Sequence, residues 1–252
     1  MNSSFWYISS IAPDAGDAAR KHGLGIEIAE YCTAWNMDEK FSETDEKVRK
    51  TINGVNALTL HAPFNELFPC AIDPKARNLA KERYLQAIKL AENYKADRII
   101  IHGGYNSKMY YPVWYTEQSV VFWREFMAEH TGDIRICLEN VFEETPDMLI
   151  DIVNGVNDPR LGVCLDIGHV NAYSEISPLI WLEKCAPYIF HYHIHNNHGD
   201  FDTHNSPGDG TIPMCELLAA AETLTPKATK ALEVLEAAPS VNWLIENNIL
   251  PA

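Results

Sequence analysis

The chain has 252 residues and a formal net charge of −15 at pH 7, and 46% of its residues are hydrophobic against 22% charged. This composition is typical of a globular protein with a large core, and it excludes the disordered and fibrous classes. The acidic excess argues against long nucleic acid as a partner, because binding to a phosphate backbone depends on Lys and Arg. The whole excess lies in residues 109–252, since residues 1–108 carry equal numbers of acidic and basic side chains.

Signals for membrane insertion or export are not visible in the sequence. No segment reaches the roughly 18 apolar residues that a membrane helix needs, and the N-terminus has neither the basic nor the long apolar region of a secretory signal. The six cysteines form no C-x-x-C pair, and Cys137 and Cys164 lie in apolar segments. We therefore expect a cytoplasmic protein with buried, reduced thiols rather than disulfides or thiolate metal sites.

Short β-branched and aromatic segments alternate with longer amphipathic segments along the chain. Helical patterns cover residues 76–94, residues 116–129 with Thr116 as the expected N-cap, and residues 147–153, which follow Thr145 and Pro146 as N-cap and first helical residue. Eight strands are predicted, at residues 5–11, 25–29, 57–61, 98–102, 134–139, 161–166, 189–195 and 231–234.

Strands that alternate with helices favour parallel pairing with right-handed crossovers. Eight such units in about 250 residues have the size of a (β/α)8 TIM barrel, so we predict one barrel domain over residues 1–252. The alternative is an open doubly wound sheet, but no G-x-G-x-x-G motif follows a strand to mark its nucleotide crevice. No Gly/Ser-rich or Pro-rich linker divides the chain.

Polar side chains end six successive predicted strands. In a barrel the carboxyl ends of the strands meet at one rim, where active sites lie. The residues concerned are His61, His102, Glu139, Asp166 with His169, the series His191, His193 and His195, then Asp202 and His204 after the seventh strand, and finally Glu233.

A single polar residue at a strand end is usually structural, but a set of four carboxylates and at least five imidazoles would be costly to bury together without compensation. Bound divalent cations supply that compensation. Imidazole and carboxylate ligands without thiolate suit Zn, Mn, Co or Fe. We expect one to three ions, or some histidines that contact substrate instead; alternation along the seventh strand places His191 deepest, in a packing role, and His195 nearest the loop.

The spaced set resembles the xylose-isomerase-like barrel superfamily, which holds sugar isomerases and epimerases and also the type IV apurinic endonucleases. The resemblance covers about residues 57–236 and is strongest over residues 161–169 and 193–212. For the isomerase type it implies a one-metal site of Glu139, Asp166, His193 and Glu233, with His169 near the substrate. For the endonuclease type it implies three zinc ions, with Glu139 bridging two, held by the nine residues His61, His102, Glu139, Asp166, His169, His193, Asp202, His204 and Glu233.

Other features must separate the two types, because both ligand sets are complete. Residues 5–11 do not match the Gly-Ala-His-Val start of the endonucleases, and residues 31–36 hold no arginine that could enter a duplex. Residues 186–226 contain no Lys or Arg, which also argues against a phosphorylated sugar. Only Phe64, after His61-Ala-Pro, keeps an aromatic residue where the endonucleases contact DNA.

Substrate contacts are expected from two loops. Isomerase-type relatives often carry an arginine soon after the strand-seven histidine, and here Asn196, Asn197 or His198 would have to replace it. The loop after strand four is rich in aromatic rings, which either stack on a sugar or cover the end of the barrel or a subunit contact. Its rings are Tyr105, Tyr110, Tyr111, Trp114 and Tyr115.

Three functional hypotheses follow. The first is a divalent-metal isomerase or epimerase acting on a small unphosphorylated keto-sugar or polyol, with Glu139 and Glu233 moving the proton and His169 steadying the substrate. The second is a multi-zinc phosphodiesterase of the endonuclease type, with Glu139 as bridge or base. The third is a metal-stabilised barrel that binds a ligand without turnover. The sequence does not determine the oligomeric state.

Overall fold

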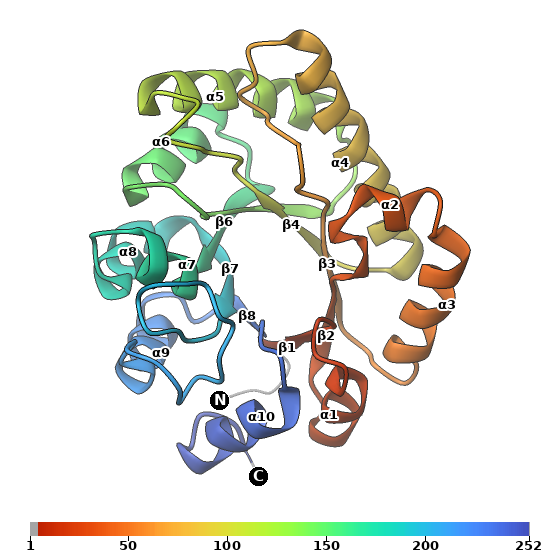
Figure 1. Ribbon diagram of the computed structural model, residues 1–252, viewed down its shortest axis with the longest axis vertical. Helices are drawn as coiled ribbons and strands as arrows, with labels where there is room; N and C mark the ends of the chain where they lie inside the picture. Colours follow the sequence, from red (N-terminus) through yellow and green to blue (C-terminus); the bar gives the residue numbers. More distant parts are fainter. Residues whose placement is uncertain (1–4, 252) are drawn as a thin grey trace.

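The chain forms a closed barrel of eight parallel strands in chain order (Figure 1), in a computed structural model that describes residues 5–251. β1 pairs with both β2 and β8, which closes the sheet. The predicted (β/α)8 barrel is therefore confirmed, and the open doubly wound alternative was wrong. The strands are β1 (Trp6–Ser9), β2 (Gly25–Ile28), β3 (Leu58–His61), β4 (Arg98–His102), β5 (Arg135–Glu139), β6 (Leu161–Asp166), β7 (Ile189–Ile194) and β8 (Thr229–Leu232).

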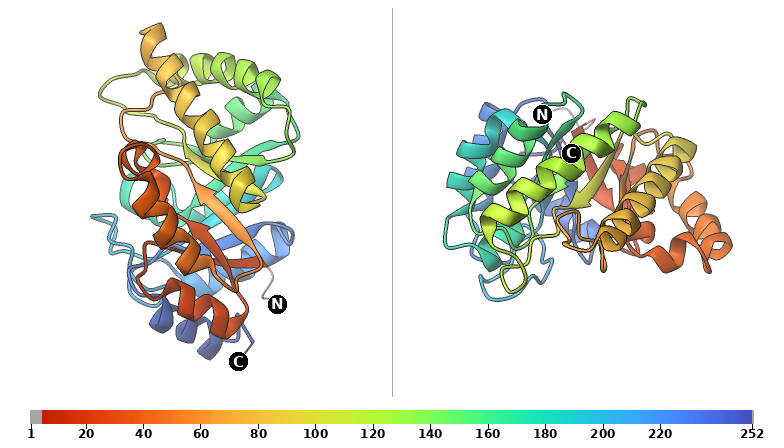
Figure 2. Two further views of the ribbon diagram at one scale, coloured as in Figure 1. Left: turned by 90° about the vertical axis from the view of Figure 1, so that its right-hand side faces the viewer. Right: turned by 90° about the horizontal axis from the view of Figure 1, so that it is seen from above.

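Helices surround the barrel on its outside (Figures 1 and 2). Helices of 4 to 21 residues follow the strands, as expected for right-handed βαβ crossovers. They are α1 (Ala15–His22), α2 (Ala34–Met37), α3 (Phe41–Ile52), α4 (Pro74–Tyr94), α5 (Pro112–Glu129), α6 (Pro146–Val156), α7 (Ile167–Tyr173), α8 (Pro178–Cys185), α9 (Met214–Leu224) and α10 (Ala237–Glu246), with short 3-10 turns η2 (Glu30–Cys32) and η3 (Ala186–Tyr188).

The strand ends differ from the prediction most at β8. This strand runs two residues earlier than predicted, so Glu233 and Val234 lie beyond its end rather than inside it. Its last pairings join Leu232 to Ile194 on β7 and to Ile8 on β1. The backbone N–H of Glu233 still donates to the Ile194 carbonyl at 3.2 Å, and the Glu233 side chain lines the mouth of the barrel.

Proline positions set the helix starts. α5 begins at Pro112 with Tyr111 as N-cap, so the prediction of Thr116 as N-cap was wrong; Thr116 lies inside the helix. A proline at the first helical position already has the required φ, which explains the earlier start. Thr145 does occupy the N-cap position of α6, although its side chain makes no capping hydrogen bond.

Two apolar regions form the core. The larger lies between the strands and the helices, and the smaller consists of Ile100, Cys137 and Cys164, with Phe190 packed against it. Side chains alternate along a strand, so Ile100 and Cys137 share a face with His102 and Glu139, two residues further on. The small cluster therefore lies inside the barrel, below the candidate ligands.

The prediction of one domain over residues 1–252 includes residues 1–4 and 252, which lie outside the described residues, as does the start of the segment considered for a secretory signal. Over residues 5–251, no helix is both long and apolar enough to cross a membrane.

Candidate metal centre

A cavity of about 420 Å³ opens at the carboxyl ends of the strands. Seven of the nine predicted ligands line it, on β3, β4 and β5, on α7, and in the loops after β7 and β8. The other two, Asp166 and His193, are fully buried beneath it. The rim that the strand-end pattern predicted is therefore the mouth of the barrel.

Four side chains meet at the centre of this mouth. Glu139, Asp166, His193 and Glu233 each offer one ligand atom, and these four atoms lie within 4.8 Å of one another. The Nδ1 atom of His193 lies 2.9 Å from Glu233 Oε2, 3.3 Å from Glu139 Oε1 and 3.5 Å from Asp166 Oδ2. Three carboxylates thus face a single imidazole nitrogen.

Glu139 connects this central group with a second one. Its Oε1 atom faces His193, whereas its Oε2 atom lies 3.2 Å from His61 Nε2 and 3.4 Å from His102 Nε2. The His102 ring is stacked on Phe64, with ring centroids 4.2 Å apart. One carboxylate therefore spans two groups of imidazoles.

A third group lies toward the loop after β7. Asp202 Oδ2 lies 3.1 Å from His169 Nε2 and 3.0 Å from His204 Nε2. His204 has a left-handed backbone, with φ at 50°, and such a conformation in a non-glycine residue often marks a functional site. All nine predicted residues are thus brought together in three adjoining groups.

Backbone carbonyls fix the orientation of three histidines. The Nδ1–H groups of His61, His169 and His204 donate to the carbonyl oxygens of Ala62, Asn140 and Glu233, at 2.8, 2.9 and 2.8 Å. A carbonyl only accepts, so Nδ1 carries a proton, and Nε2 is the ring nitrogen that faces a carboxylate in each case and could bind a cation. This arrangement is typical of histidines that bind metal.

Asp166 has a structural function besides its place in the central group. It is the N-cap of α7, where its Oδ1 atom accepts a hydrogen bond of 2.6 Å from the backbone N–H of His169. The same oxygen lies 3.1 Å from Nε2 of His195. That histidine ring passes so close to α7 that a Cβ atom on Gly168 would lie 1.9 Å from it, so only glycine fits there.

The orphaned atoms of the mouth test whether a cation fits. Within residues 5–251, Glu139 Oε1, His193 Nδ1 and Asp202 Oδ1 are buried without an aligned hydrogen bond, although oppositely polarised atoms lie close by. Buried polar atoms are nearly always satisfied in folded proteins. Ligand atoms that converge on one point without bonding to each other, in a mixed imidazole and carboxylate set, fit a divalent cation such as Zn, Mn, Co or Fe.

The charges of the mouth agree with this fit. Burial alone would raise the pKa of Glu139, but the imidazoles of His193 and His102 hold it well below its ordinary value. Burial also lowers the pKa of His102 to about 4. For His204, burial acts to lower the pKa, but the hydrogen bond to Asp202 raises it to about 9. The ionised carboxylates therefore attract positive charge, either protons on imidazoles or a cation.

The loop residues predicted to contact substrate do not reach the cavity. Asn196 is buried, donates to Pro207 O and accepts from Ile212 N, so it holds the loop together. Asn197 donates to Gly168 O, and His198 lies exposed at the surface. The Asn196 amide therefore satisfies the backbone of the loop, and the Asn197 amide joins the loop to α7.

The aromatic loop after β4 is also absent from the cavity lining. Tyr115 and Tyr105 are buried and donate to Glu143 and Glu144, and Tyr111 is 84% exposed on the surface. Tyr105 and Tyr115 therefore pack in the core, and none of the five rings lines this cavity. Stacking on a sugar, covering the barrel end and a subunit contact all stay predictions for this loop. The rings that do line the cavity are Phe64, Phe142 and Tyr173.

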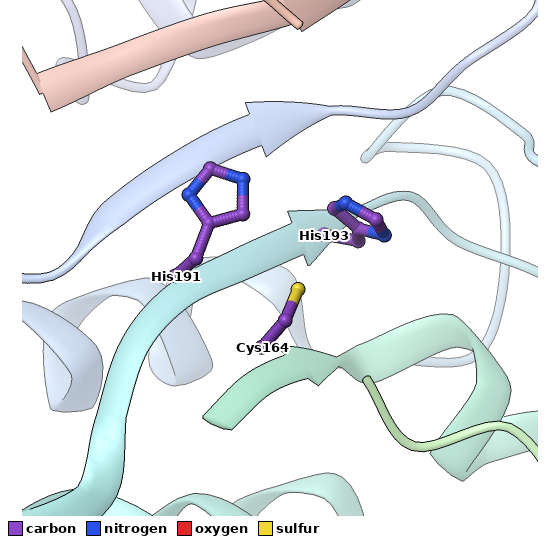
Figure 3. A group of neighbouring side chains, drawn as sticks. All are labelled: Cys164, His191 and His193. Carbon is purple, nitrogen blue, oxygen red and sulfur yellow. The ribbon is translucent and has the colours of Figure 1, made fainter. Parts of the chain in front are cut away.

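The sequence analysis missed Glu27 and assigned no ligand role to His195. Glu27 lies on β2, is fully buried, and contacts both His191 and His193. Figure 3 shows His191 and His193 projecting from β7 on the same side, with Cys164 of β6 pointing toward them, and His191 is the deeper of the two as predicted. A charged residue in the middle of an apolar strand, as in Gly-Ile-Glu-Ile, was the signal that could have found Glu27.

The model of a protein family described as xylose isomerase-like TIM barrel (AP_endonuc_2) matches residues 17–244 of the chain. The chain belongs to this family. The predicted superfamily is therefore confirmed.

Two curated relatives match part of the chain. The uncharacterized protein MJ1311 of Methanocaldococcus jannaschii is 31% identical over 176 residues, which make up 64% of this chain and 58% of that protein. A probable endonuclease 4 of Ureaplasma parvum serovar 3 is 24% identical over 139 residues, 52% of this chain and 45% of that protein. The chain thus spans about half the length of the curated relatives it matches.

Two solved structures share the whole barrel. The TTHB071 protein from Thermus thermophilus, soaked with ZnCl2, superposes with a TM-score of 0.78 at 25% identity, over 96% of this chain and 97% of that one. A D-tagatose 3-epimerase-like protein superposes with a TM-score of 0.76 at 24% identity, over 96% of each chain. The second likeness shows the fold alone.

Proposed function

We propose that this family member is a divalent-metal-dependent isomerase or epimerase acting on a small, unphosphorylated keto-sugar or polyol. One observation carries the proposal: Glu139, at the end of β5, and Glu233, just after β8, approach the same point above His193 Nδ1 from separate strands. Two carboxylates on either side of one metal-binding point are what a proton transfer next to a carbonyl requires.

The cation, held by Glu139, Asp166, His193 and Glu233, would supply Lewis-acid polarisation of a substrate carbonyl. Glu139 accepts the proton from the adjacent carbon. Glu233 first takes up a proton from solvent in the open cavity and delivers it to the other side of that carbon, and Glu139 then releases its proton to solvent, so both carboxylates return to their ionised form. Both glutamates have a pKa below the ordinary value, since the charges of nearby imidazoles outweigh burial, so both are ionised and able to accept a proton. His169 faces the cavity and holds a substrate hydroxyl.

The cavity lining supports a neutral substrate of sugar size. A volume of about 420 Å³ is within the range of small-molecule sites. Phe64, Phe142 and Tyr173 offer apolar ring faces to the C–H groups of a sugar. Among the described residues, the lining contains no Lys or Arg that could bind a phosphate group.

A multi-metal phosphodiesterase of the endonuclease type is the second candidate. The observation that favours it is the pair of additional groups, one of His61 and His102 facing Glu139 Oε2, the other of His169, His204 and Asp202. Together with the central group they could hold three ions and clamp both oxygens of a phosphoester. The acidic net charge and the lack of Lys or Arg among the described residues of the cavity lining disfavour DNA as its substrate.

Metal analysis and solvent exchange together separate the candidates. Protein purified without chelator is expected to hold about one tightly bound ion per chain and to incorporate deuterium from D2O into members of a keto-sugar panel. Glu233→Gln is expected to abolish this incorporation, while Glu236→Gln, an exposed glutamate three residues later, retains it. Three tightly bound zinc ions, cleavage of an abasic-site oligonucleotide and no deuterium incorporation would establish the phosphodiesterase instead. Ligand binding without exchange or cleavage would identify a non-catalytic barrel.

A further inference from the structure

A buried carboxylate lies directly beneath the central group. Glu27 projects from β2 into the barrel and is fully buried. Its Oε1 atom lies 3.0 Å from Nε2 of His193, and its Oε2 atom lies 3.1 Å from Nε2 of His191. Thr59 of β3 donates a hydrogen bond of 3.0 Å to Oε2. Burying a charged carboxylate costs free energy, so its presence here indicates a functional role.

His193 differs from the other histidines of the mouth in its orientation. His61, His169 and His204 direct Nε2 to the carboxylates and hold Nδ1–H on a backbone carbonyl. In His193 the two nitrogens exchange places: Nδ1 faces the three carboxylates, and Nε2 faces Glu27. Glu27 therefore lies on the side of the ring where a carbonyl lies for the others, with Oε1 3.0 Å from Nε2, although the two atoms form no aligned hydrogen bond in this structure. A carboxylate is the stronger acceptor, and it raises the basicity of the ligand nitrogen.

The cluster of Cys164, His191 and His193 beneath the central group could instead be a cation site of its own, but its contacts argue against this. Cys164, His191 and His193 each place one possible ligand atom within 4.8 Å of the others, which could hold a cation inside the barrel (Figure 3). The nitrogens of His191 already have partners, because Nδ1 lies 2.6 Å from Thr229 Oγ1 and Nε2 faces Glu27. Burial also raises the pKa of the Cys164 thiol well above its ordinary value, so the thiol stays protonated.

We propose that Glu27 is a positioning residue that holds His193 with a proton on Nε2 and its Nδ1 lone pair toward the cation. Thr59 and His191 fix the carboxylate in turn, and Thr229 fixes His191. Glu27 touches neither the cation nor the substrate; it acts through His193. This inference rests on the metal centre of the proposed function, and it adds a support that no strand-end residue provides.

Metal affinity tests the inference without any assay of turnover. Glu27→Gln keeps the shape of the side chain but removes its charge, and we expect the dissociation constant for Zn²⁺, measured by competition with a chromophoric chelator, to rise by about 10- to 100-fold. The visible absorption spectrum of the Co²⁺-loaded variant is expected to change, because the strength and angle of one ligand change. Wild-type affinity in Glu27→Gln would overturn the inference. Absence of cation binding in the wild type would instead overturn the proposed metal centre itself.

Glu143→Gln is the matched control. It makes the same substitution at another buried glutamate, whose oxygens accept hydrogen bonds from Tyr115 and the Val141 amide rather than facing His193. We expect a loss of thermal stability with a change in Zn²⁺ affinity of less than about threefold. Equal losses of affinity in both variants would show that Glu27 acts only through the stability of the barrel.

A spectroscopic measurement on the wild-type protein does not depend on any variant folding. In Zn²⁺-loaded protein with ¹⁵N-labelled histidine, we expect the His193 signal to show a proton on Nε2 and metal on Nδ1, whereas His61 shows the opposite. Metal on Nε2 of His193 would overturn the inference. A thiolate-to-Co²⁺ charge-transfer band would do so as well, since it would place the cation beside Cys164.

Discussion

Charged side chains are paired differently at the two ends of the barrel interior. At the amino-terminal end, Arg98 makes two bonds with Asp97, of 2.9 and 2.7 Å, and donates to Phe190 O and to Thr229 Oγ1. At the carboxyl end, carboxylates and imidazoles approach within 2.9 to 3.5 Å, but several of their atoms have no aligned partner. The groups at the first end are hydrogen-bonded to one another, while the second end is where we propose that a cation binds. On that proposal, stability and chemistry lie at opposite ends of the barrel, as is general for TIM barrels.

Glu139→Gln is expected to have the largest effect at the carboxyl end. The amide keeps the size of the side chain but cannot accept the substrate proton or bridge the two groups of imidazoles. We expect kcat/KM to fall by about 10³-fold or more, which corresponds to about 4 kcal/mol in the barrier. The thermal stabilisation that saturating Zn²⁺ gives the wild type, about 2.7 kcal/mol at a hundredfold excess over Kd, is expected to disappear.

The control for that variant is Glu143→Gln. Glu143 is buried in the loop that follows the same strand, and its oxygens accept hydrogen bonds from Tyr115 and the Val141 amide. It should lose stability but retain activity and Zn²⁺ binding. Full activity in Glu139→Gln would remove Glu139 from the mechanism and with it the contrast between the two ends.

Arg98→Met removes the hydrogen-bonded charge at the amino-terminal end of the barrel. The apolar side chain fills much of the space of arginine but leaves Asp97, Thr229 and the Phe190 carbonyl without their shared donor. We expect the free energy of unfolding to fall by about 3 kcal/mol, or the Tm by about 6 to 12 °C, in a calorimetric scan. Zn²⁺ affinity should match that of the wild type. A loss of affinity as large as that of Glu139→Gln would show that the two ends are coupled.

The smallest effects are expected from substitutions of two exposed aromatic residues. Phe142 lines the cavity and packs edge-on against Tyr173, with ring centroids 5.0 Å apart, whereas Tyr111 lies on the surface outside it. For any substrate that the exchange panel identifies, Phe142→Ser is expected to raise KM by about tenfold, from the loss of one ring contact. Tyr111→Ser should change KM by less than about twofold, and a reversed order would favour the aromatic loop as a sugar platform.

The barrel and the residues of its rim were predictable because two simple patterns in the sequence indicate them. Alternating strand and helix patterns fix the topology, and a polar residue at each strand end appears in a single sequence as a break in an apolar segment, as at His102 or Glu139. The closeness of the nine residues follows from the barrel alone. Their grouping into three sets could not be predicted, since it depends on which oxygen or ring nitrogen faces which neighbour.

The failures have physical causes. Asn196 and Asn197 were candidates for substrate contact because a polar loop residue can either bind a substrate or hold the loop in place. Only the path of the loop shows that the Asn196 amide bonds the loop backbone and the Asn197 amide bonds α7. The sequence did not decide between the functions considered for the aromatic loop. Tyr105 and Tyr115 are buried through contacts with Glu144 and Glu143, which belong to another loop. Glu27 was missed because it lies in the middle of a strand, below the rim on which the prediction concentrated.

The double use of Asp166 bears on how this site could decay over evolutionary time. Its carboxylate both caps α7 and faces His193, so its loss would damage the fold as well as the chemistry. Glu233 lies beyond the last strand and has no such second duty in a helix. If a relative has lost the proposed proton transfer, we therefore expect it to retain the aspartate longer than the glutamate. On the proposed function, the residue at position 233 is then the better indicator of catalytic activity among relatives of this chain.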